Sequence, residues 1–188
     1  MSVSLPTNKE SLIASIEKGA AFDYLFFWGH RKSTDAGVTK ACFSQWYDSP
    51  FRVDGELFRT AEHYMMVRKA RLFDDTVVAE AILKAATPNE AKSLGRRVKG
   101  FSEARWLEHR EEIVFTGNAA KFSQKVEFRS FLLEAGDKVL VEASPVDAIW
   151  GIGLSQDHPS ASTPAAWPGL NLLGFALVKV RARLRNSF

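Results

Sequence analysis

The sequence predicts an α+β fold, in the form of a compact single domain that is mostly helical and carries a small antiparallel or mixed sheet. The chain has 188 residues, 46% hydrophobic and 25% charged, which suits one domain with a sizeable core. Apolar residues recur with helical spacing through the middle of the chain, whereas the strand-like runs are short. Because strands and helices do not alternate regularly, a doubly wound parallel sheet is not expected.

The N-terminal part, residues 1–23, is expected to form a helical extension ahead of the main domain at 24–188. Thr7 is a suitable N-cap for a short helix in which Leu12 and the neighbouring isoleucines share one face. Gly19 is expected to end this helix.

Strands are expected next. Residues 24–28 are rich in aromatic side chains and too short for a helix, which predicts a buried strand. After a polar loop at 29–40, residues 51–53 and 56–58 flank Asp54-Gly55, a dipeptide typical of two-residue hairpin turns.

Helices should fill the middle of the chain. They are expected from Thr60 to about Phe73, from about Thr76 to Ala86, from Thr87 onward, from Glu103 to about Phe122, and from Val126 to Ala135. Thr87, Pro88 and Glu90 together predict a capping box at a helix start.

The C-terminal third contains one more strand signal, at residues 138–142. Residues 157–169 are rich in Ser, Pro and Ala, which predicts an exposed loop. Residues 178–185 alternate as a strand would, but a longer apolar stripe from Leu173 to Leu184 favours a helix. The basic residues of this segment are interpreted as a solvated helix face.

Several function classes are disfavoured by composition. Cys42 is the single cysteine, so no internal disulfide is possible, and the N-terminus lacks the features of a secretory signal. We therefore expect a reduced, cytoplasmic protein. No apolar run is long enough to span a bilayer, so no membrane partner is expected. The net charge of +3 is too small to demand a nucleic-acid partner.

Glu62 is the first candidate for chemistry. It follows Thr60 in the first turn of an expected helix, where the helix dipole and free N–H groups favour an ionised carboxylate. Such a group suits a base, or a stabiliser of developing positive charge, and not a proton donor. The alternative is an ordinary first-turn glutamate that only helps the helix.

Asp147 is a second candidate, because Trp150 and Gly151 follow it closely and glycine lets a chain approach a ligand. A loop carrying Asp147 could complete a paired-carboxylate site with Glu62. The alternative is a turn aspartate beside a core tryptophan. Gly151 and Gly153 alone make a weak dinucleotide fingerprint.

Other chemistries have less support. The histidines share no short spacing, so no metal site is expected, and Cys42 is more typical of a buried apolar residue than of a nucleophile. Basic side chains on the helices after Glu62 either gather around a phosphate or meet only water. They are Lys69, Arg96, Arg97 and Lys121.

Read together, these features resemble the NADAR (YbiA-like) family over about residues 24–184. The segments that carry the match are Phe43-Ser44-Gln45-Trp46, Asp54-Gly55-Glu56-Leu57-Phe58-Arg59-Thr60-Ala61-Glu62-His63-Tyr64, Asp147-x-x-Trp150-Gly151 and Asn171-x-Leu173-Gly174. Further landmarks are Ala91-Lys92-Ser93-Leu94-Gly95-Arg96 and Asn118-x-x-Lys121-Phe122.

The resemblance implies a compact α+β fold and an N-glycosidase that needs no metal or cofactor. Members cleave phosphoribosylamino-pyrimidine intermediates of riboflavin synthesis and release ribose 5-phosphate, and some relatives remove ADP-ribose from guanine bases of DNA or RNA. Expected partners are therefore a small phosphoribosyl or ADP-ribosyl substrate, or ADP-ribosylated nucleic acid. A third alternative is a module that binds such a nucleotide without cleaving it.

The family motifs place the catalytic roles on Glu62 and Asp147. Glu62 is expected to stabilise an oxocarbenium-like transition state, and Asp147 either to hold a ribose hydroxyl or to assist the proton transfer. The residues expected to bind substrate are Phe43, Trp46, Tyr64, Lys69, Arg96, Lys121, Trp150, Gly151 and Asn171. Among them, Phe43 and Trp150 are expected to stack on the base, and the cations to bind phosphate. The sequence departs from the family at Gln45 and Trp46, where many members have Asn and Phe. Many relatives also carry a lysine soon after the first strand, a region occupied here by Gly29-His30-Arg31-Lys32.

Overall fold

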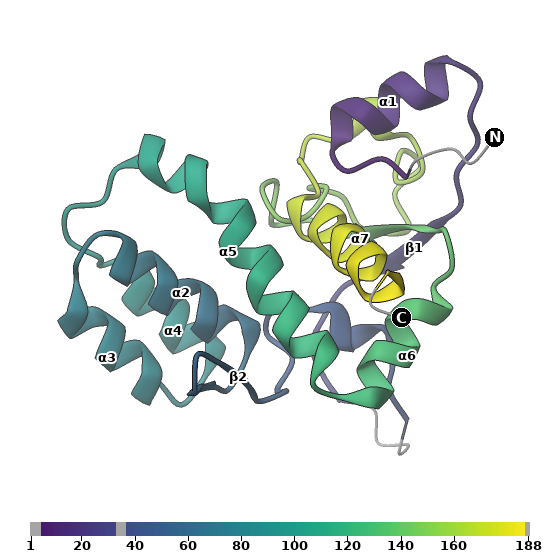
Figure 1. Cartoon of the computed structure of the whole chain (residues 1–188). Helices are drawn as coiled ribbons and strands as arrows, with labels where there is room; N and C mark the ends of the chain where they lie inside the picture. Colours follow the sequence, from purple (N-terminus) through teal and green to yellow (C-terminus); the bar gives the residue numbers. More distant parts are fainter. Residues whose placement is uncertain (1–4, 33–36, 187–188) are drawn as a thin grey trace.

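The computed structural model describes residues 5–32 and 37–186 (Figure 1). Its α-helices are α1 (Lys9–Glu17), α2 (Ala61–Leu72), α3 (Thr76–Lys84), α4 (Pro88–Gly95), α5 (Glu103–Ser123), α6 (Val126–Glu134) and α7 (Leu172–Arg185). Its strands are β1 (Tyr24–Phe27), β2 (Phe51–Val53), β3 (Glu56–Phe58) and β4 (Val139–Glu142). Two short 3₁₀ helices complete it, η1 (Lys40–Phe43) and η2 (Pro164–Ala166). No helix in the described residues is long and apolar enough to cross a membrane.

The long helix α5 is the centre of the arrangement. Helices α2, α3 and α4 form one group that packs on α5 through α2. Helix α7 packs on α5 from another side and also covers β4, so that α1, β1 and α7 lie apart from the α2–α4 group (Figure 1). The candidate site described below therefore draws its residues from helices on one side of α5 and from strands and loops on the other.

The α+β class is confirmed, but the strands form two separate sheets of two strands each among the described residues. Strand β1 pairs in parallel with β4, from Tyr24 opposite Val139 to Phe27 opposite Glu142. Strands β2 and β3 form the expected antiparallel hairpin. Its turn residues Asp54 and Gly55 have φ values of 51° and 82°, the left-handed pair that a type I′ turn requires.

The buried apolar residues form two clusters, and β4 separates them. Leu140 points into the larger cluster among the helices, whereas Val139 and Val141 belong to a smaller cluster. This alternation follows the period of two of a strand. Leu12 of α1 and Trp167 also belong to the smaller cluster, so the N-terminal helix helps to cover the β1–β4 sheet.

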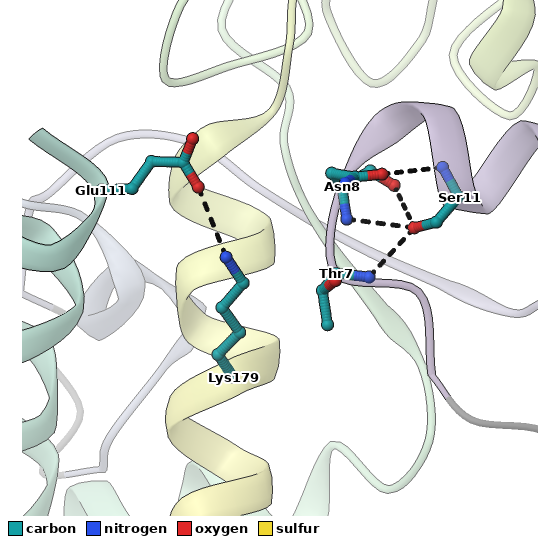
Figure 2. A network of polar contacts seen from close by, with 5 residues as sticks. All are labelled: Thr7, Asn8, Ser11, Glu111 and Lys179. Carbon is teal, nitrogen blue, oxygen red and sulfur yellow. Dashed lines mark hydrogen bonds and ion pairs between the residues drawn. The ribbon is translucent and has the colours of Figure 1, made fainter. Parts of the chain in front are cut away.

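The first helix begins one residue later than predicted. Asn8, and not Thr7, is the N-cap: its side chain accepts a hydrogen bond from Ser11 N at 2.7 Å, and the Ser11 hydroxyl in turn accepts from Asn8 N (Figure 2). Figure 2 also shows the ion pair between Lys179 of α7 and Glu111 of α5, at 3.3 Å. The capping box at Thr87 is present in part, because Glu90 accepts from Ala86 N.

Several other expectations about exposure are wrong. Trp28 lies beyond the end of β1 and is 59% exposed. The segment at 157–169 is not simply an exposed loop, because Trp167 is 2% exposed and its indole donates to Ala161 O at 2.7 Å. Helix α7 is confirmed, yet Arg181 on it is buried, so its basic residues do not form one solvated face.

Cys42 lies in η1, within the larger cluster, and its side chain is completely buried. Burial raises the pKa of its thiol to about 12, mainly because a thiolate would lose its hydration there. A buried apolar role, as expected from the sequence, fits this environment better than nucleophilic chemistry.

Candidate active site

A cavity of about 170 Å³ lies between the α2–α4 group and the end of β4. Its wall contains three carboxyl groups, three cationic side chains and three tryptophans, together with smaller polar and sulfur-containing side chains. The lining residues are Ser44, Gln45, Trp46, Glu62, Met65, Met66, Lys69, Lys92, Arg96, Trp106, Glu142, Asp147 and Trp150. The structure thus brings together Glu62 and Asp147, which are 85 positions apart in the sequence.

Glu62 is held in the first turn of α2. The Thr60 hydroxyl caps this helix by accepting from His63 N, and Glu62 N donates to Gln45 O at 3.0 Å. The Glu62 side chain is only 3% exposed, and its Oε1 has no hydrogen-bond partner within the described residues. The carboxyl group therefore faces the cavity with one oxygen unpaired.

The expectation that Glu62 is simply ionised at neutral pH is corrected by this burial. Loss of hydration raises its pKa to about 7. The charge of Lys92 and a hydrogen bond from Trp46 oppose that rise, while Asp147 adds to it. The helix dipole favours the charged form, but it does not outweigh desolvation in this position.

Asp147 is fixed by its own loop. Its Oδ1 accepts hydrogen bonds from Ile149 N and Trp150 N, both at 2.9 Å, which is an Asx-type turn. Gly151 follows this turn, where a Cβ atom would lie 2.8 Å from Glu142 O and 2.9 Å from Asp147 O. Only glycine therefore lets the loop lie against the end of β4.

Glu142 is a functional candidate that sequence reasoning missed. It is the last residue of β4, and its Oε2 is buried without a partner in the described part of the chain. Burial raises its pKa to about 8, with further increases from Asp147 and then Glu62, while Lys92 lowers it. Its position after three apolar strand residues is the one signal that could have suggested it.

Cationic side chains also line the cavity. Lys69 donates to Gly95 O at 2.9 Å and lies over the rings of Phe101, at 4.4 Å, and Trp106, at 5.6 Å. Burial lowers the pKa of Lys69, as does the charge of Arg96, while Glu62 raises it. Lys92 was not predicted as a site residue, although it precedes Arg96 by four positions on α4 and so shares its face.

Aromatic rings form the remaining walls. Trp46 and Trp150 line the cavity as expected and are both partly exposed. Trp106, near the start of α5, packs partly against the larger cluster and also lines the cavity. Lys92 lies 5.7 Å from the centre of the Trp46 ring, and His30 packs against the same ring at 5.5 Å.

Five residues expected to bind substrate do not line this cavity, and one of them is Gly151 in the turn after Asp147. Phe43 is fully buried in the core against Phe27, Phe122 and Phe131, so its ring faces are covered. Tyr64 is likewise buried, against Phe51 and Phe58. Each sits beside a lining residue in sequence but points to the other side of its element.

Lys121 and Asn171 also lie outside the cavity, and both are buried polar residues whose side chains form hydrogen bonds with backbone groups. Lys121 donates to Ser44 O at 2.9 Å, and Asn118, one helical turn earlier, donates to Gln45 Oε1 at 2.8 Å. These contacts attach the segment that carries Trp46 to helix α5. Asn171 accepts from Glu142 N and donates to Leu140 O, both at 2.9 Å, so it supports the end of β4.

The described residues contain no group of three or more His, Cys, Asp or Glu side chains arranged to hold a metal ion. The chemistry available in the cavity is instead that of two buried carboxyl groups with raised pKa values, beside cations and flat aromatic faces. Carboxyl groups of this kind can exchange protons and stabilise a cationic sugar near neutral pH.

Comparisons with known proteins agree with the motifs. The model of the NADAR domain family matches residues 26–185. The chain is 44% identical over 163 residues to "N-glycosidase R617" of Acanthamoeba polyphaga mimivirus, covering 84% of this chain and 94% of that protein. It is 32% identical to "N-glycosidase YbiA" of Escherichia coli strain K12, over 76% of this chain and 80% of the relative.

A solved structure shares the fold. The NMR structure of the E. coli protein YbiA matches with a TM-score of 0.68 and 28% sequence identity, over 89% of this chain and 88% of that one.

Proposed function

The chain belongs to the NADAR domain family, it is a hydrolase acting on N-glycosyl bonds, and we propose that its substrate is a phosphoribosylamino-pyrimidine of riboflavin synthesis. Hydrolysis of this compound, of the 5-amino-6-(5-phosphoribosylamino)uracil type, would release ribose 5-phosphate. One observation carries the proposal: a single small cavity combines carboxyl groups, cations and aromatic faces. A sugar, a phosphate and a flat base need these three kinds of partner.

Glu62 is the proposed stabiliser of the sugar cation. The transition state of glycosidic cleavage carries positive charge on C1′ and the ring oxygen, so an ionised carboxylate beside it lowers the barrier. The same carboxylate can orient the attacking water and accept its proton. A pKa of about 7 makes Glu62 substantially ionised at and above neutral pH.

Asp147 is proposed to hold a ribose hydroxyl. Its Oδ1 is occupied by two backbone N–H groups, and its Oδ2 has no hydrogen bond to the described residues. The turn also sets the position of Trp150, whose ring can stack on the base. Asp147 thus links the placement of the sugar to that of the base.

The phosphate is proposed to lie near Lys69, Lys92 and Arg96. All three line the same cavity, and a planar guanidinium can bind two phosphate oxygens at once. Lys121, which was expected in this group, is replaced by Lys92, because Lys121 is buried on Ser44 O.

A second candidate is removal of ADP-ribose from guanine bases of DNA or RNA. Phe101 is 47% exposed beside the cavity and lies against Lys69, so an aromatic face is available next to the proposed phosphate region. An adenine ring at the end of a diphosphate could stack there. The phosphoribosyl substrate is preferred because the cavity itself is small.

The test is a substrate comparison. The purified protein is incubated with the phosphoribosylamino-pyrimidine and, separately, with a guanine-ADP-ribosylated oligonucleotide, and products are followed by mass spectrometry. Release of ribose 5-phosphate from the first alone supports the proposal. Release of ADP-ribose from the second alone supports the other substrate, and binding without cleavage of either would indicate a nucleotide-binding module.

The Glu62→Gln variant is the matched control for this assay. It preserves the shape of the side chain but cannot be ionised, so we expect turnover to be abolished while the protein stays folded. A group of this kind contributes several kcal/mol to catalysis. Residual activity above about a tenth of the wild type would contradict the role of Glu62.

A further inference from the structure

We propose that Glu142 is the general acid that protonates the leaving base during cleavage of the glycosidic bond. The inference rests on the proposed function, because it concerns the same cavity and the same bond. It adds the proton donor, a role that neither Glu62 as the base nor Asp147 as the sugar ligand fills.

The geometry leaves the Glu142 side chain free for this role. Its main chain is fixed on both sides: the N–H donates to Asn171 Oδ1, and the carbonyl accepts from Ile152 N at 2.9 Å. Its Oε2 is buried, has no partner within the described ranges, and belongs to a residue that lines the cavity. The strand end therefore places a buried carboxyl group in the cavity wall without using it in the fold.

The charges around Glu142 favour its protonated form. The carboxyl groups of Asp147 and Glu62 act on it across the cavity, and both disfavour a further negative charge. Lys92 is the cation that opposes them, while Lys69 and Arg96 line the same cavity. Burial and these charges raise the pKa of Glu142 to about 8, which favours its protonated form near neutral pH.

The two buried carboxyl groups of the cavity wall then share the work. The C1′–N bond breaks, its electron pair goes to the nitrogen, and that nitrogen takes the proton from the Glu142 carboxyl group. A water molecule then bonds to C1′ and gives its proton to the Glu62 carboxylate. Return of this proton from Glu62 to Glu142, directly or through solvent, restores both groups.

A leaving group that needs no proton provides the test. In both candidate substrates the base leaves through an amino nitrogen, which must be protonated. In nicotinamide mononucleotide the base leaves as a neutral pyridine. We would measure kcat against pH for wild type, Glu142→Gln and Glu62→Gln on the cleaved amine-linked substrate, and on nicotinamide mononucleotide if the wild type cleaves it.

For Glu142→Gln we expect kcat on the amine-linked substrate to fall about 100-fold or more, and the alkaline decline near pH 8 to disappear. Cleavage of nicotinamide mononucleotide should change by less than about threefold. Glu62→Gln should lose both reactions, and the exposed Glu111→Gln should lose neither. Circular dichroism and thermal unfolding verify that each variant is folded, and Glu142→Asp, which retains an acid, should recover part of the activity.

The inference is overturned if Glu142→Gln keeps kcat within about threefold, if its alkaline decline is unchanged, or if both kinds of leaving group suffer equally. These results differ from failure of the proposed function. In that case the wild-type protein itself would cleave neither amine-linked substrate.

Discussion

At the scale of single residues, the chemistry of the cavity depends on how burial changes the pKa values of its carboxyl groups. Glu62 and Glu142 are common residues at a helix start and a strand end. Both acquire raised pKa values because their carboxyl groups are removed from water and the charge of Asp147 adds to the rise. This is the pattern expected where one acid and one base must coexist at the same pH.

Lys92 sets the pH range of this pair, because it is the first cation to oppose the rise in the pKa of Glu62. Removing its charge should raise the pKa values of both Glu62 and Glu142. We therefore expect the kcat optimum of Lys92→Met to move to higher pH, whereas Lys92→Arg and the exposed Lys84→Met keep it near the wild type. An unchanged optimum in Lys92→Met would show that this charge does not act on the pair.

The burial of Lys121 predicts that the free energy of unfolding depends on pH. Its burial lowers its pKa from 10.5 to about 7, so between these values the unfolded chain holds a proton that the folded chain has released. The free energy of unfolding should therefore rise with pH in this window, by up to about 1.4 kcal/mol per pH unit from this group. Below pH 7 Lys121 is protonated in both states, so it causes no further change of the free energy of unfolding with pH.

Urea unfolding at several pH values checks this expectation. Lys121→Met removes the titrating group, so its stability should rise less between pH 7 and 10 than that of the wild type. The exposed Lys84→Met is the control and should keep the wild-type slope. Equal slopes for Lys121→Met and the wild type would mean that Lys121 stays protonated in the fold.

At the scale of elements, the junction between β4 and α7 supports the strand end that lines the cavity. Asn171 is the N-cap of α7 with a left-handed φ of 55°, and its side chain satisfies two backbone groups of β4. Asn tolerates this conformation better than most residues. The end of β4, and with it Glu142, is thus fastened to the start of a buried helix.

Asn171→Ala should remove both hydrogen bonds and leave the buried Leu140 O without its side-chain donor. We expect a loss of about 1–3 kcal/mol in the free energy of unfolding, measured by urea titration. Asn186→Ala, at the exposed end of the same helix, should change it by less than about 0.5 kcal/mol. A similar small effect at both positions would contradict a supporting role for Asn171.

Most elements could be predicted because their local sequence signals agree with the structure that forms. The hairpin turn and the cap at Thr60 follow from residue type, and the stripe of α7 follows from spacing. The errors occur where tertiary contacts decide: Trp167 is buried because the smaller core needs a large ring beside α1, not because its own segment is apolar. Trp106 packs against the larger cluster and also lines the cavity, and its helical spacing alone does not show the second contact.

The candidate site was predictable only in part. Glu62, Asp147 and Trp150 belong to recognisable motifs, and the structure brings them together. Glu142 has no motif of its own, and its role depends on which side of β4 faces the loop at Gly151. A period of two places neighbouring side chains on opposite faces, but it does not say which face meets a cavity.

At the scale of the whole molecule, α1 is part of the core that holds β1 and β4. Leu12 is fully buried against the smaller cluster, although the extension lies outside the matched family region. Leu12→Ala should therefore lower the free energy of unfolding by about 2–5 kcal/mol in urea titration. Ile16→Ala, at a partly exposed position of the same helix, should cost less than about 1 kcal/mol.

Because Cys42 is buried, its chemical labelling can be used to measure how often the protein opens. Alkylating reagents attack thiolates, and this thiol is both inaccessible and held protonated by its surroundings. Labelling by iodoacetamide therefore requires the core to open first. Since no second cysteine competes for the reagent, the rate of mass increase measures how often the molecule unfolds under native conditions.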